Sequence, residues 1–263
     1  MPRSVLSYAA WAGHARLRYL LGHAVGVTAV LAALAWAAQR SGLDLALAAW
    51  CFDPAAGRFP WNDSPWLELL GHRLVLALPV GVALAALAGA SASYRVSALR
   101  PWRPALWAIV LTCALGQVLI AQLKHWTALP RPYDLAMFGG KAALPAHWWA
   151  ASRAEAGGAL PSGHAGAGFA LLALYFAGWA RGRPHWRWGG LAAGTCAGGV
   201  FAAVRILQGA HFLSQTLWSA ALMWLLASLC FYPVLARARP GGVLAAGSPL
   251  AVAAATAGTR AGA

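Results

Sequence analysis

The sequence predicts an all-α membrane protein, a polytopic bundle of about six transmembrane helices with both termini inside (N-in and C-in). Hydrophobic residues make up 60% of the 263 residues and charged residues only 10%, whereas a soluble domain carries about 25% charged residues. So few charges cannot form a soluble surface, and we therefore expect lipid to cover much of the exterior. In addition, six apolar runs each approach the roughly 20 residues that cross a bilayer as a helix.

Each apolar run is predicted to form one membrane-spanning helix. Because five runs follow the first, we expect the first to be a retained anchor rather than a cleaved signal peptide. The fifth run is short and rich in glycine, which favours close packing against other helices. A further apolar segment, 43–52, is too short to span and is expected at the membrane interface. The six predicted spans are 20–38, 67–90, 106–123, 163–180, 189–204 and 212–235.

Charge asymmetry predicts the orientation. If the N-terminus lies inside, the predicted cytoplasmic segments contain twelve of the twenty Lys and Arg residues, and all six acidic residues lie on the other side. This split follows the positive-inside rule and predicts a multi-pass protein of a bacterial-type inner membrane. In a soluble protein, the formal net charge of +14 would suggest nucleic-acid binding. Here the basic residues flank apolar runs, so no nucleic-acid partner is expected.

The chain is predicted to form one membrane-embedded domain over residues 1–239. The tail, 240–263, is rich in Gly and Ala without an amphipathic pattern, and we expect it to be disordered. The four cysteines are not spaced as zinc ligands and are interpreted as small apolar residues. The sequence indicates no oligomeric state.

Three short motifs lie at predicted outer helix ends, where the positive-inside rule does not call for basic residues. KHWTALPRP begins at Lys124 and contains Arg131. PSGH, at 161–164, opens the fourth predicted helix, and RILQGAH, from Arg205 to His211, joins the fifth to the sixth. All three motifs fall on the same side of the membrane, although the topology would have allowed each on either side.

The residue types in these motifs suit a phosphate group. Lys124, Arg131 and Arg205 would repel one another if they converged without an anion, and arginine binds phosphate oxygens in a bidentate manner. The first turn of the helix at PSGH offers backbone amides to an anion. Gly163 allows the backbone to come close, and the Ser162 hydroxyl can donate a further hydrogen bond.

The two histidines of the motifs can supply the chemistry of phosphoryl transfer. A neutral imidazole can attack phosphorus and form a phosphohistidine, and a second imidazole can protonate the leaving oxygen near neutral pH. The residues alone do not say which of His164 and His211 takes which part.

The three motifs together resemble those of the type-2 phosphatidic acid phosphatase family (lipid phosphatases, vanadium haloperoxidase-like), whose pattern is KxxxxxxRP, PSGH and SRxxxxxHxxxD. The resemblance extends from the third to the sixth predicted helix and implies a similar six-helix fold. It implies that His211 is the nucleophile, that His164 is the general acid, and that no metal or other cofactor is needed. It also implies a set of phosphate-binding residues: Lys124, Arg131, Ser162, Gly163 and Arg205.

Two positions depart from the family pattern. Val204 replaces the serine before the motif arginine, and Gln215 replaces the aspartate that closes the third motif. Because Gln215 follows His211 by four residues, both side chains can share one helix face, and the amide oxygen can accept a hydrogen bond but adds no charge. Gln215 is therefore counted with His211 and His164 among the predicted catalytic residues. In serine proteases, a comparable Asp-to-Asn change lowers the rate about 10⁴-fold through the wrong tautomer. Asp134 is considered as a substitute carboxylate from the outer loop.

The leading functional hypothesis is hydrolysis of a lipid phosphate or diphosphate monoester through a phosphohistidine. The resemblance makes phosphatidic acid, phosphatidylglycerol phosphate, isoprenyl diphosphate and lipid A plausible substrates. A lipid phosphotransferase could use the same site, and a catalytically weakened lipid-phosphate-binding protein is a third hypothesis, based on Gln215. A transporter is disfavoured because charged residues are lacking near the middle of the predicted spans.

Overall fold

The computed structural model describes residues 13–69 and 75–237, and within these residues it is all-helical, as predicted. Extended backbone pairing in this part of the chain is limited to isolated bridges, such as Thr127 with Trp149. The tail for which we predicted disorder, 240–263, lies outside the described residues, as do residues 70–74 of the second predicted span.

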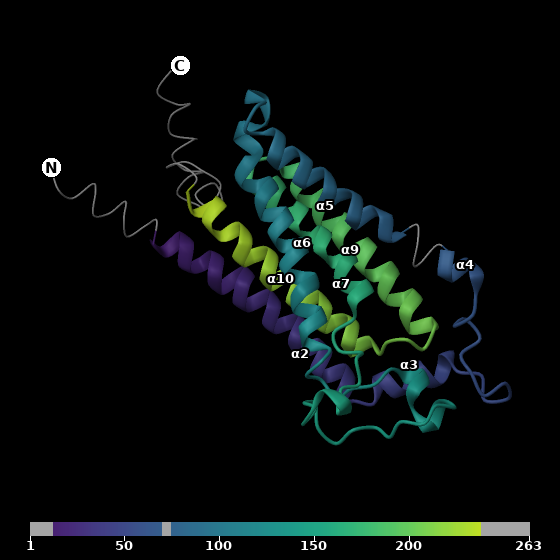
Figure 1. Ribbon diagram of the computed structural model, residues 1–263. Helices are drawn as coiled ribbons and strands as arrows, with labels where there is room; N and C mark the ends of the chain where they lie inside the picture. The colour runs from purple at the N-terminus through teal and green to yellow at the C-terminus, as the bar shows by residue number, and fades with distance from the viewer. Residues whose placement is uncertain (1–12, 70–74, 238–263) are drawn as a thin grey trace, which may run out of the picture.

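Helices lie in all six predicted spans (Figure 1). The long helical segments are η1 (Leu20–Val27) with α2 (Thr28–Arg40), α5 (Val75–Ala92), α6 (Arg103–Leu123), α7 (Gly163–Phe169), α8 (Ala173–Ala180), α9 (Pro184–Leu207) and α10 (Leu213–Ala236). Shorter elements connect them: α3 (Leu43–Cys51), α4 (Pro65–Glu68), η3 (Ser97–Trp102), η4 (Pro132–Asp134), η5 (Ala136–Phe138), η6 (Arg153–Glu155) and η7 (Ala170–Leu172).

The fifth helix, α9, is longer than predicted, because it begins at Pro184 instead of residue 189. Proline is well suited to the first turn of a helix, since its fixed φ is helical and its missing N–H would have no partner there. The first turn of α9 is therefore helical although its residues are polar. Because the predicted start was based on hydrophobicity alone, it was placed too late.

Four helical segments of the described chain are long and apolar enough to cross a membrane: Gly13–Arg40, Ser97–Leu123, Pro184–Leu207 and Leu213–Ala236. The apolar part of α5 is shorter. Large apolar side chains such as Val30, Leu84 and Val118 are exposed on the outer helices, as expected for surfaces covered by lipid tails. The protein is therefore membrane-embedded, while the exact number of six crossings stays a prediction.

The helical run formed by α7, η7 and α8 occupies the centre of the bundle. It packs against α6, α9 and α10, and most of its side chains are buried. A helix surrounded by other helices needs small residues for close packing rather than large lipid-facing side chains. The fourth predicted span is rich in Gly and Ala for this reason, and it is therefore not among the four helices that are long and apolar enough to cross a membrane.

Glycines on one face of α9 bring this helix unusually close to α7 and α8. A Cβ atom at Gly190 or Gly194 would lie 2.5 or 2.6 Å from the backbone of the neighbouring helix, and one at Gly198 would lie 2.2 Å from the Phe169 ring. Side chains other than hydrogen therefore do not fit at these positions. The close packing predicted for the fifth span is confirmed.

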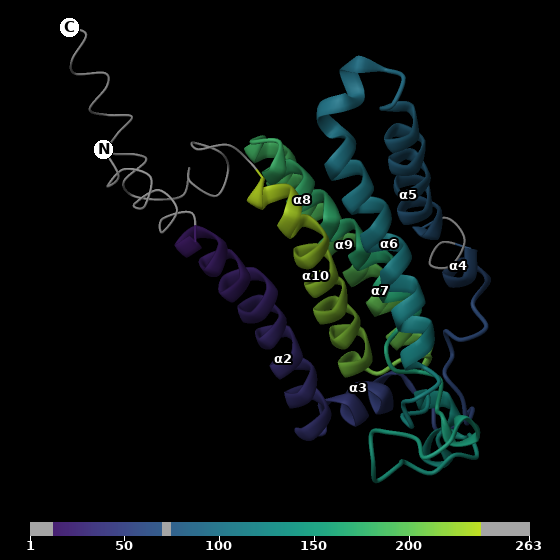
Figure 2. The same ribbon diagram turned by 60° about the vertical axis from the view of Figure 1, so that its left-hand side comes forward.

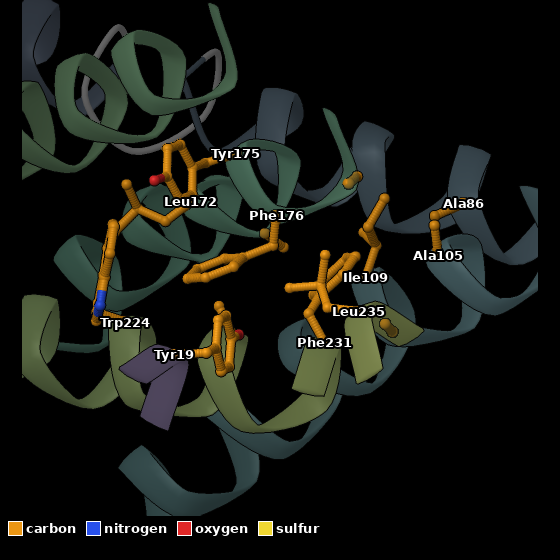
Figure 3. Close-up of a cluster of buried hydrophobic side chains, with 14 residues drawn as sticks. Tyr19, Ala86, Ala105, Ile109, Leu172, Tyr175, Phe176, Trp224, Phe231 and Leu235 are labelled. Atoms are coloured by element: carbon orange, nitrogen blue, oxygen red, sulfur yellow. The ribbon is translucent and has the colours of Figure 1, made fainter. Parts of the chain in front are cut away.

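An aromatic core ties the first helix to α8 and α10 (Figure 3). Phe176 of α8 stacks on Phe231 of α10, with ring centroids 5.9 Å apart, and contacts the Trp224 ring edgewise at 5.2 Å. The Tyr19 hydroxyl donates to the Ser228 carbonyl at 2.7 Å. Burial of such large rings supplies much of the packing energy.

Among the described residues, basic side chains of the segments that we assigned to the cytoplasm lie at one end of the bundle. Arg16 donates to the Ala236 carbonyl at 3.3 Å, and Arg181 donates to the Pro101 carbonyl at 3.1 Å. The opposite end carries the long segment between α6 and α7 together with α3 (Figure 1). The segments that connect the helices thus lie at two opposite ends of the bundle, as the predicted topology requires. Which end faces the cytoplasm stays a prediction.

The short helix α3 follows a left-handed turn at Gly42, whose φ is 79°. It contacts both α9 and α10. Its buried face belongs to an apolar cluster of Ala48, Cys51, Phe59, Leu135, Phe138 and Phe212. Segment 43–52, which we predicted to lie at the interface, therefore supports the loops at this end of the bundle.

Candidate functional site

All three sequence motifs lie at the end of the bundle that carries α3. Lys124 is the C-cap residue of α6, and Ser162 is the N-cap residue of α7. Arg205 lies in the last turn of α9, and His211 lies in the short connection to α10. Segments distant in sequence are thus brought to neighbouring helix ends.

The turn after α9 places His211 beside Arg205. Gly209 has a φ of 64°, a left-handed conformation that favours glycine after a helix. The turn lets the N–H groups of Ala210 and His211 both donate to the Arg205 carbonyl, at 2.9 and 3.2 Å. A Cβ atom at position 209 would also lie 2.4 Å from the Phe59 ring. Glycine is therefore required by both the backbone angle and the available space.

The PSGH segment is fixed against α10 by its backbone. Ser162 is fully buried, its N–H donates to the Gln215 carbonyl at 3.2 Å, and its own carbonyl accepts from the Ser219 hydroxyl at 2.9 Å. The Ser162 Oγ also accepts the N–H of Ala165 at 3.4 Å, which is the usual helix-capping contact. As Oγ acts as an acceptor there, its own hydrogen is available to a ligand.

Lys124 reaches over the first turn of α7. A Cβ atom placed on Gly163 would lie 3.5 Å from Lys124 Nζ. The absence of a side chain at Gly163 therefore leaves open the space between the ammonium group and the helix N-terminus. Both features attract an anion.

The segment after α6 brings Arg131 to the same place. The N–H of Tyr133 donates to the Gly209 carbonyl at 3.0 Å, which attaches this segment to the turn between α9 and α10. Arg131 Nη1 donates to the Tyr133 hydroxyl at 2.7 Å. Arg131 is thereby held beside the turn that carries His211.

Lys124 lies close enough to Arg131 and Arg205 for both positive charges to act on it. Burial lowers the pKa of Lys124, and the positive charges of Arg131 and Arg205 lower it further. The Nε atoms of both arginines are buried without a hydrogen-bond partner, although Arg205 Nη1 donates to Gln208 at 2.8 Å. Within the described residues, none of the three cations forms an ion pair. An anion with several oxygens, such as phosphate, would satisfy this arrangement.

Gln215 joins all three motifs by hydrogen bonds. Its Oε1 lies 3.0 Å from His211 Nδ1 and accepts the Phe212 N–H at 3.0 Å. Its Nε2 donates to the Pro130 carbonyl at 3.0 Å, next to Arg131. Its backbone carbonyl accepts from Ser162. The residue that departs from the family pattern is therefore the structural link between the motifs.

These bonds determine the tautomer of His211. The Phe212 N–H can only donate and the Pro130 carbonyl can only accept, so the Gln215 amide cannot be turned around. Its oxygen must then face His211 Nδ1, which has to carry the hydrogen. The other ring nitrogen, Nε2, is left with a free lone pair, which is the form a nucleophile needs.

Burial also keeps His211 neutral. Its side chain is only 3% exposed, and this burial lowers its pKa from 6.5 to about 3. The nearby cations act in the same direction, whereas the hydrogen bond to Gln215 opposes the shift. At neutral pH the imidazole is therefore uncharged.

The other predicted residues are placed less directly. His164 lies in the first turn of α7, with its ring centroid 6.5 Å from that of Phe201. Asp134, considered above as a substitute carboxylate, forms no hydrogen bond with His211 within the described residues; the partner of His211 Nδ1 is Gln215. Val204 precedes Arg205 within α9 and supplies no polar group.

One further residue, Asp44 of α3, was not predicted to take part. It is 6% exposed, and its carboxylate accepts the Ser214 N–H at 2.9 Å and the Ser214 hydroxyl at 2.5 Å. Asp44 thus caps the first turn of α10, next to Gln215. A single acidic residue in an otherwise apolar short helix was the available sequence signal.

Comparison with curated proteins and with solved structures gave no match. A family model described as the PAP2 superfamily matches residues 105–239, just over half of the chain. The matched part contains all three motifs and excludes α2 and α3. A match of this extent, together with the motifs gathered at one end of a helical bundle, shows that the chain belongs to the PAP2 superfamily, whose members are phosphatase-like.

Proposed function

We propose that this protein hydrolyses the phosphate or diphosphate monoester of a lipid through a phosphohistidine on Nε2 of His211, without a metal cofactor. The observation that carries the proposal is a neutral imidazole whose Nδ1 is held by Gln215 beside three converging cations. Its lone pair and its surroundings suit an attack on a bound phosphate.

In the first step, the Nε2 lone pair forms a bond to phosphorus and the bond from phosphorus to the lipid oxygen breaks. His164, in its protonated form, gives its proton to the leaving alkoxide. The imidazole becomes cationic, and its Nδ1–H donates to the Gln215 oxygen. Gln215 touches the nucleophile and not the substrate, so it is a positioning residue rather than a catalytic one.

In the second step, water attacks phosphorus and the bond from Nε2 to phosphorus breaks. The neutral His164 takes the proton of the water, which restores both histidines and releases inorganic phosphate. Throughout, Lys124, Arg131 and Arg205 would neutralise the phosphoryl oxygens, and the Ser162 hydroxyl and the Gly163 amide would donate to them.

The membrane-embedded helices support a lipid as the substrate. The candidate site lies at helix ends, so a phosphate head group can bind there while its apolar tail stays among lipids. By the positive-inside rule, this end is proposed to face the periplasm or the exterior, because the basic residues gather at the other end.

The test is phosphate release by the purified protein in EDTA from phosphatidic acid, phosphatidylglycerol phosphate, isoprenyl diphosphate and lipid A. We expect at least one substrate to be hydrolysed, and His211→Ala to abolish release and phosphoenzyme formation. Full activity of His211→Ala would overturn the assigned nucleophile, and loss of activity in EDTA, restored by a metal, would overturn the metal-free mechanism.

The bonding of Gln215 counts against a protein that only binds lipid phosphate. The reason for suspecting a weakened site was the risk of the wrong histidine tautomer, and the observed bonds favour the right one. Transfer to a lipid acceptor would use the same phosphohistidine, so labelled phosphate should be traced with and without an added acceptor lipid. Recovery of the label in lipid instead of inorganic phosphate would identify a phosphotransferase.

A further inference from the structure

An apolar groove lies along α10, beside the start of the PSGH segment. It encloses about 270 Å³, and Figure 2 shows α10 between α2 and α6. Thr28 of α2, Leu123 of α6 and Trp218 of α10 contribute to its walls, and Pro161 lies at its rim with the indole of Trp148. In sequence, Leu123 directly precedes Lys124 and Pro161 directly precedes Ser162. The groove therefore begins where the candidate phosphate site ends.

Two polar atoms in this apolar groove have no partner. Thr28 Oγ1 and Trp218 Nε1 are both buried without a hydrogen bond. Leaving a buried donor unpaired is costly, and native proteins rarely do so. Trp224, on the same helix, shows the usual arrangement, because its Nε1 donates to the His23 carbonyl at 2.9 Å.

Both unpaired atoms belong to residues that line the same groove. The bond from Trp224 to His23 fixes the register of η1, which continues into α2, against the antiparallel α10. Thr28 follows His23 by five residues, and Trp218 precedes Trp224 by six. Thr28 and Trp218 therefore both lie on the candidate-site side of that bond.

The chemistry of this pair defines the missing partner. An indole N–H can only donate, and a threonine hydroxyl can donate as well. One carbonyl oxygen could accept from both, while the rest of the groove contacts hydrocarbon. Fatty-acyl esters and amides combine these two features, whereas isoprenyl chains and ether-linked alkyl chains have no carbonyl group.

We infer that Thr28 and Trp218 form a subsite for the acyl carbonyl of the lipid, so that the protein prefers fatty-acyl lipid phosphates over isoprenyl or ether-linked ones. This inference rests on the proposed hydrolysis of a lipid phosphate. Trp218 follows Gln215 by less than one helical turn, so the subsite lies slightly deeper in the membrane than His211. In a glycerophosphate ester, the carbonyl is likewise separated from the phosphorus by a few covalent bonds. Thr28 lies outside the family match of residues 105–239, so the family pattern does not specify this subsite.

The test compares dioleoyl phosphatidic acid with its ether-linked analogue, which has the same chains and phosphate but no carbonyl. We expect the parent protein to prefer the ester by about tenfold in kcat/KM, chiefly through KM, as loss of a hydrogen bond predicts. Trp218→Phe and Thr28→Val, which preserve the apolar shape, should each reduce the preference, and together they should abolish it.

Trp149→Phe is the matched control. Its indole also lines the groove but is 64% exposed, so its N–H can bond to water. This variant should keep the preference of the parent protein. Equal turnover of ester and ether by the parent protein, or an unchanged preference in the Trp218→Phe and Thr28→Val double variant, would overturn the subsite.

The proposed subsite and the proposed hydrolysis can be tested separately. Water-soluble p-nitrophenyl phosphate has no acyl chain, so its His211-dependent hydrolysis tests the chemistry alone and should be unaffected by Trp218→Phe. Conversely, the same lipid pair can be compared in a binding assay with His211→Ala, which needs no turnover. A preference for the ester in that assay would support the subsite, and no preference would refute it.

Discussion

The arginines at the two ends of the bundle differ in the groups that surround their charges. At the end opposite the candidate site, Arg103 donates to the Ser93 hydroxyl at 2.8 Å and lies 4.0 Å over the Tyr94 ring. Arg181 donates to a backbone carbonyl and lies 4.8 Å over Trp102. At the site end, Arg131 lies 5.6 Å over the Tyr133 ring and Arg205 donates to Gln208, but the positive charges of both arginines also act on Lys124 and lower its pKa.

This difference distinguishes arginines that are stabilised by contacts within the protein from cations that are suited to binding an anion. Contacts with aromatic faces and carbonyls stabilise a cation within the protein. Mutual repulsion does not, and it persists only if a bound anion compensates for it. The comparison thus predicts that changes at the site end affect activity, whereas changes at the other end affect stability.

The largest effect is expected at Gln215. Gln215→Leu removes the acceptor of the His211 Nδ1–H and should lower kcat/KM about 10³- to 10⁴-fold, because the imidazole loses its tautomer and orientation. Gln215→Glu keeps that acceptor but loses the donor to the Pro130 carbonyl, and it should retain much more activity. Steady-state phosphate release measures both variants, and equal losses would show that the hydrogen bond to His211 is not what matters.

Removing one converging arginine should have the next largest effect. Arg205→Gln and Arg131→Gln should each lower kcat/KM about 10²- to 10³-fold through loss of charge on the phosphoryl oxygens. Arg181→Gln is the control from the opposite end, and it should lower the unfolding temperature while turnover stays close to the parent value. If Arg181→Gln lowers turnover as much as Arg205→Gln does, the contrast between the two ends is wrong.

Gly163→Ala tests the space beneath Lys124. The new methyl group fits sterically, 3.5 Å from Nζ, but it occupies the place proposed for a phosphate oxygen. We expect a 10- to 100-fold loss in kcat/KM, about the effect of a small misplacement, with unchanged folding. Gly199→Ala, in open space on α9, is the control, and it should leave activity unaltered.

The pH dependence of kcat/KM should reflect the lowered pKa values of His211 and Lys124. Because the pKa of His211 lies near 3, protonation of the nucleophile should not reduce the rate at pH 5 to 6, as it would for an ordinary histidine. Because the pKa of Lys124 is lowered from 10.5, its charge is lost at a lower pH than usual, and activity should decline there. Lys124→Arg should move this alkaline decline to higher pH; an unmoved profile would assign the decline to another group.

The smallest effect is expected at Asp44, which supports the site from outside the family match. Asp44→Ala leaves the Ser214 N–H and hydroxyl without their acceptor and should lower the free energy of unfolding by about 1–3 kcal/mol. Asp44→Asn keeps one acceptor oxygen and should lose less. Unfolding in detergent checks both, and equal losses would argue that the charge and not the hydrogen bonding stabilises this contact.

Much of the fold could be predicted because the signals are local. Apolar runs identified where helices lie, and the glycines of the fifth span indicated that this helix packs closely against others, which the structure shows to be α7 and α8. The start of α9 at Pro184 was missed, since its first turn is helical but polar. The run from Gly163 to Ala180 was identified as one more span, and only its packing shows that it is the centre of the bundle.

The candidate site was predictable in its residues but not in its bonding. Spacing predicted that Gln215 could reach His211 along one helix face. The structure shows their side chains 3.0 Å apart, although His211 precedes the N-cap of α10 and does not lie on the helix itself. The partner of the Gln215 amide nitrogen, the Pro130 carbonyl, lies 85 residues away, and the bond from Ser214 to Asp44 joins residues 170 apart. No pattern along the chain indicates contacts of this kind.

The sequence by itself determined the membrane-embedded helices, the grouping of the motifs at one end and the residue types suited to a phosphate. These features depend on hydrophobicity, charge and spacing, which are properties of the chain read in order. Only the tertiary structure decided which way the Gln215 amide faces, that Asp44 caps α10, and that Thr28 and Trp218 line one apolar groove. Hydrogen-bond partners depend on the relative placement of distant helices, and that placement is fixed by packing in three dimensions.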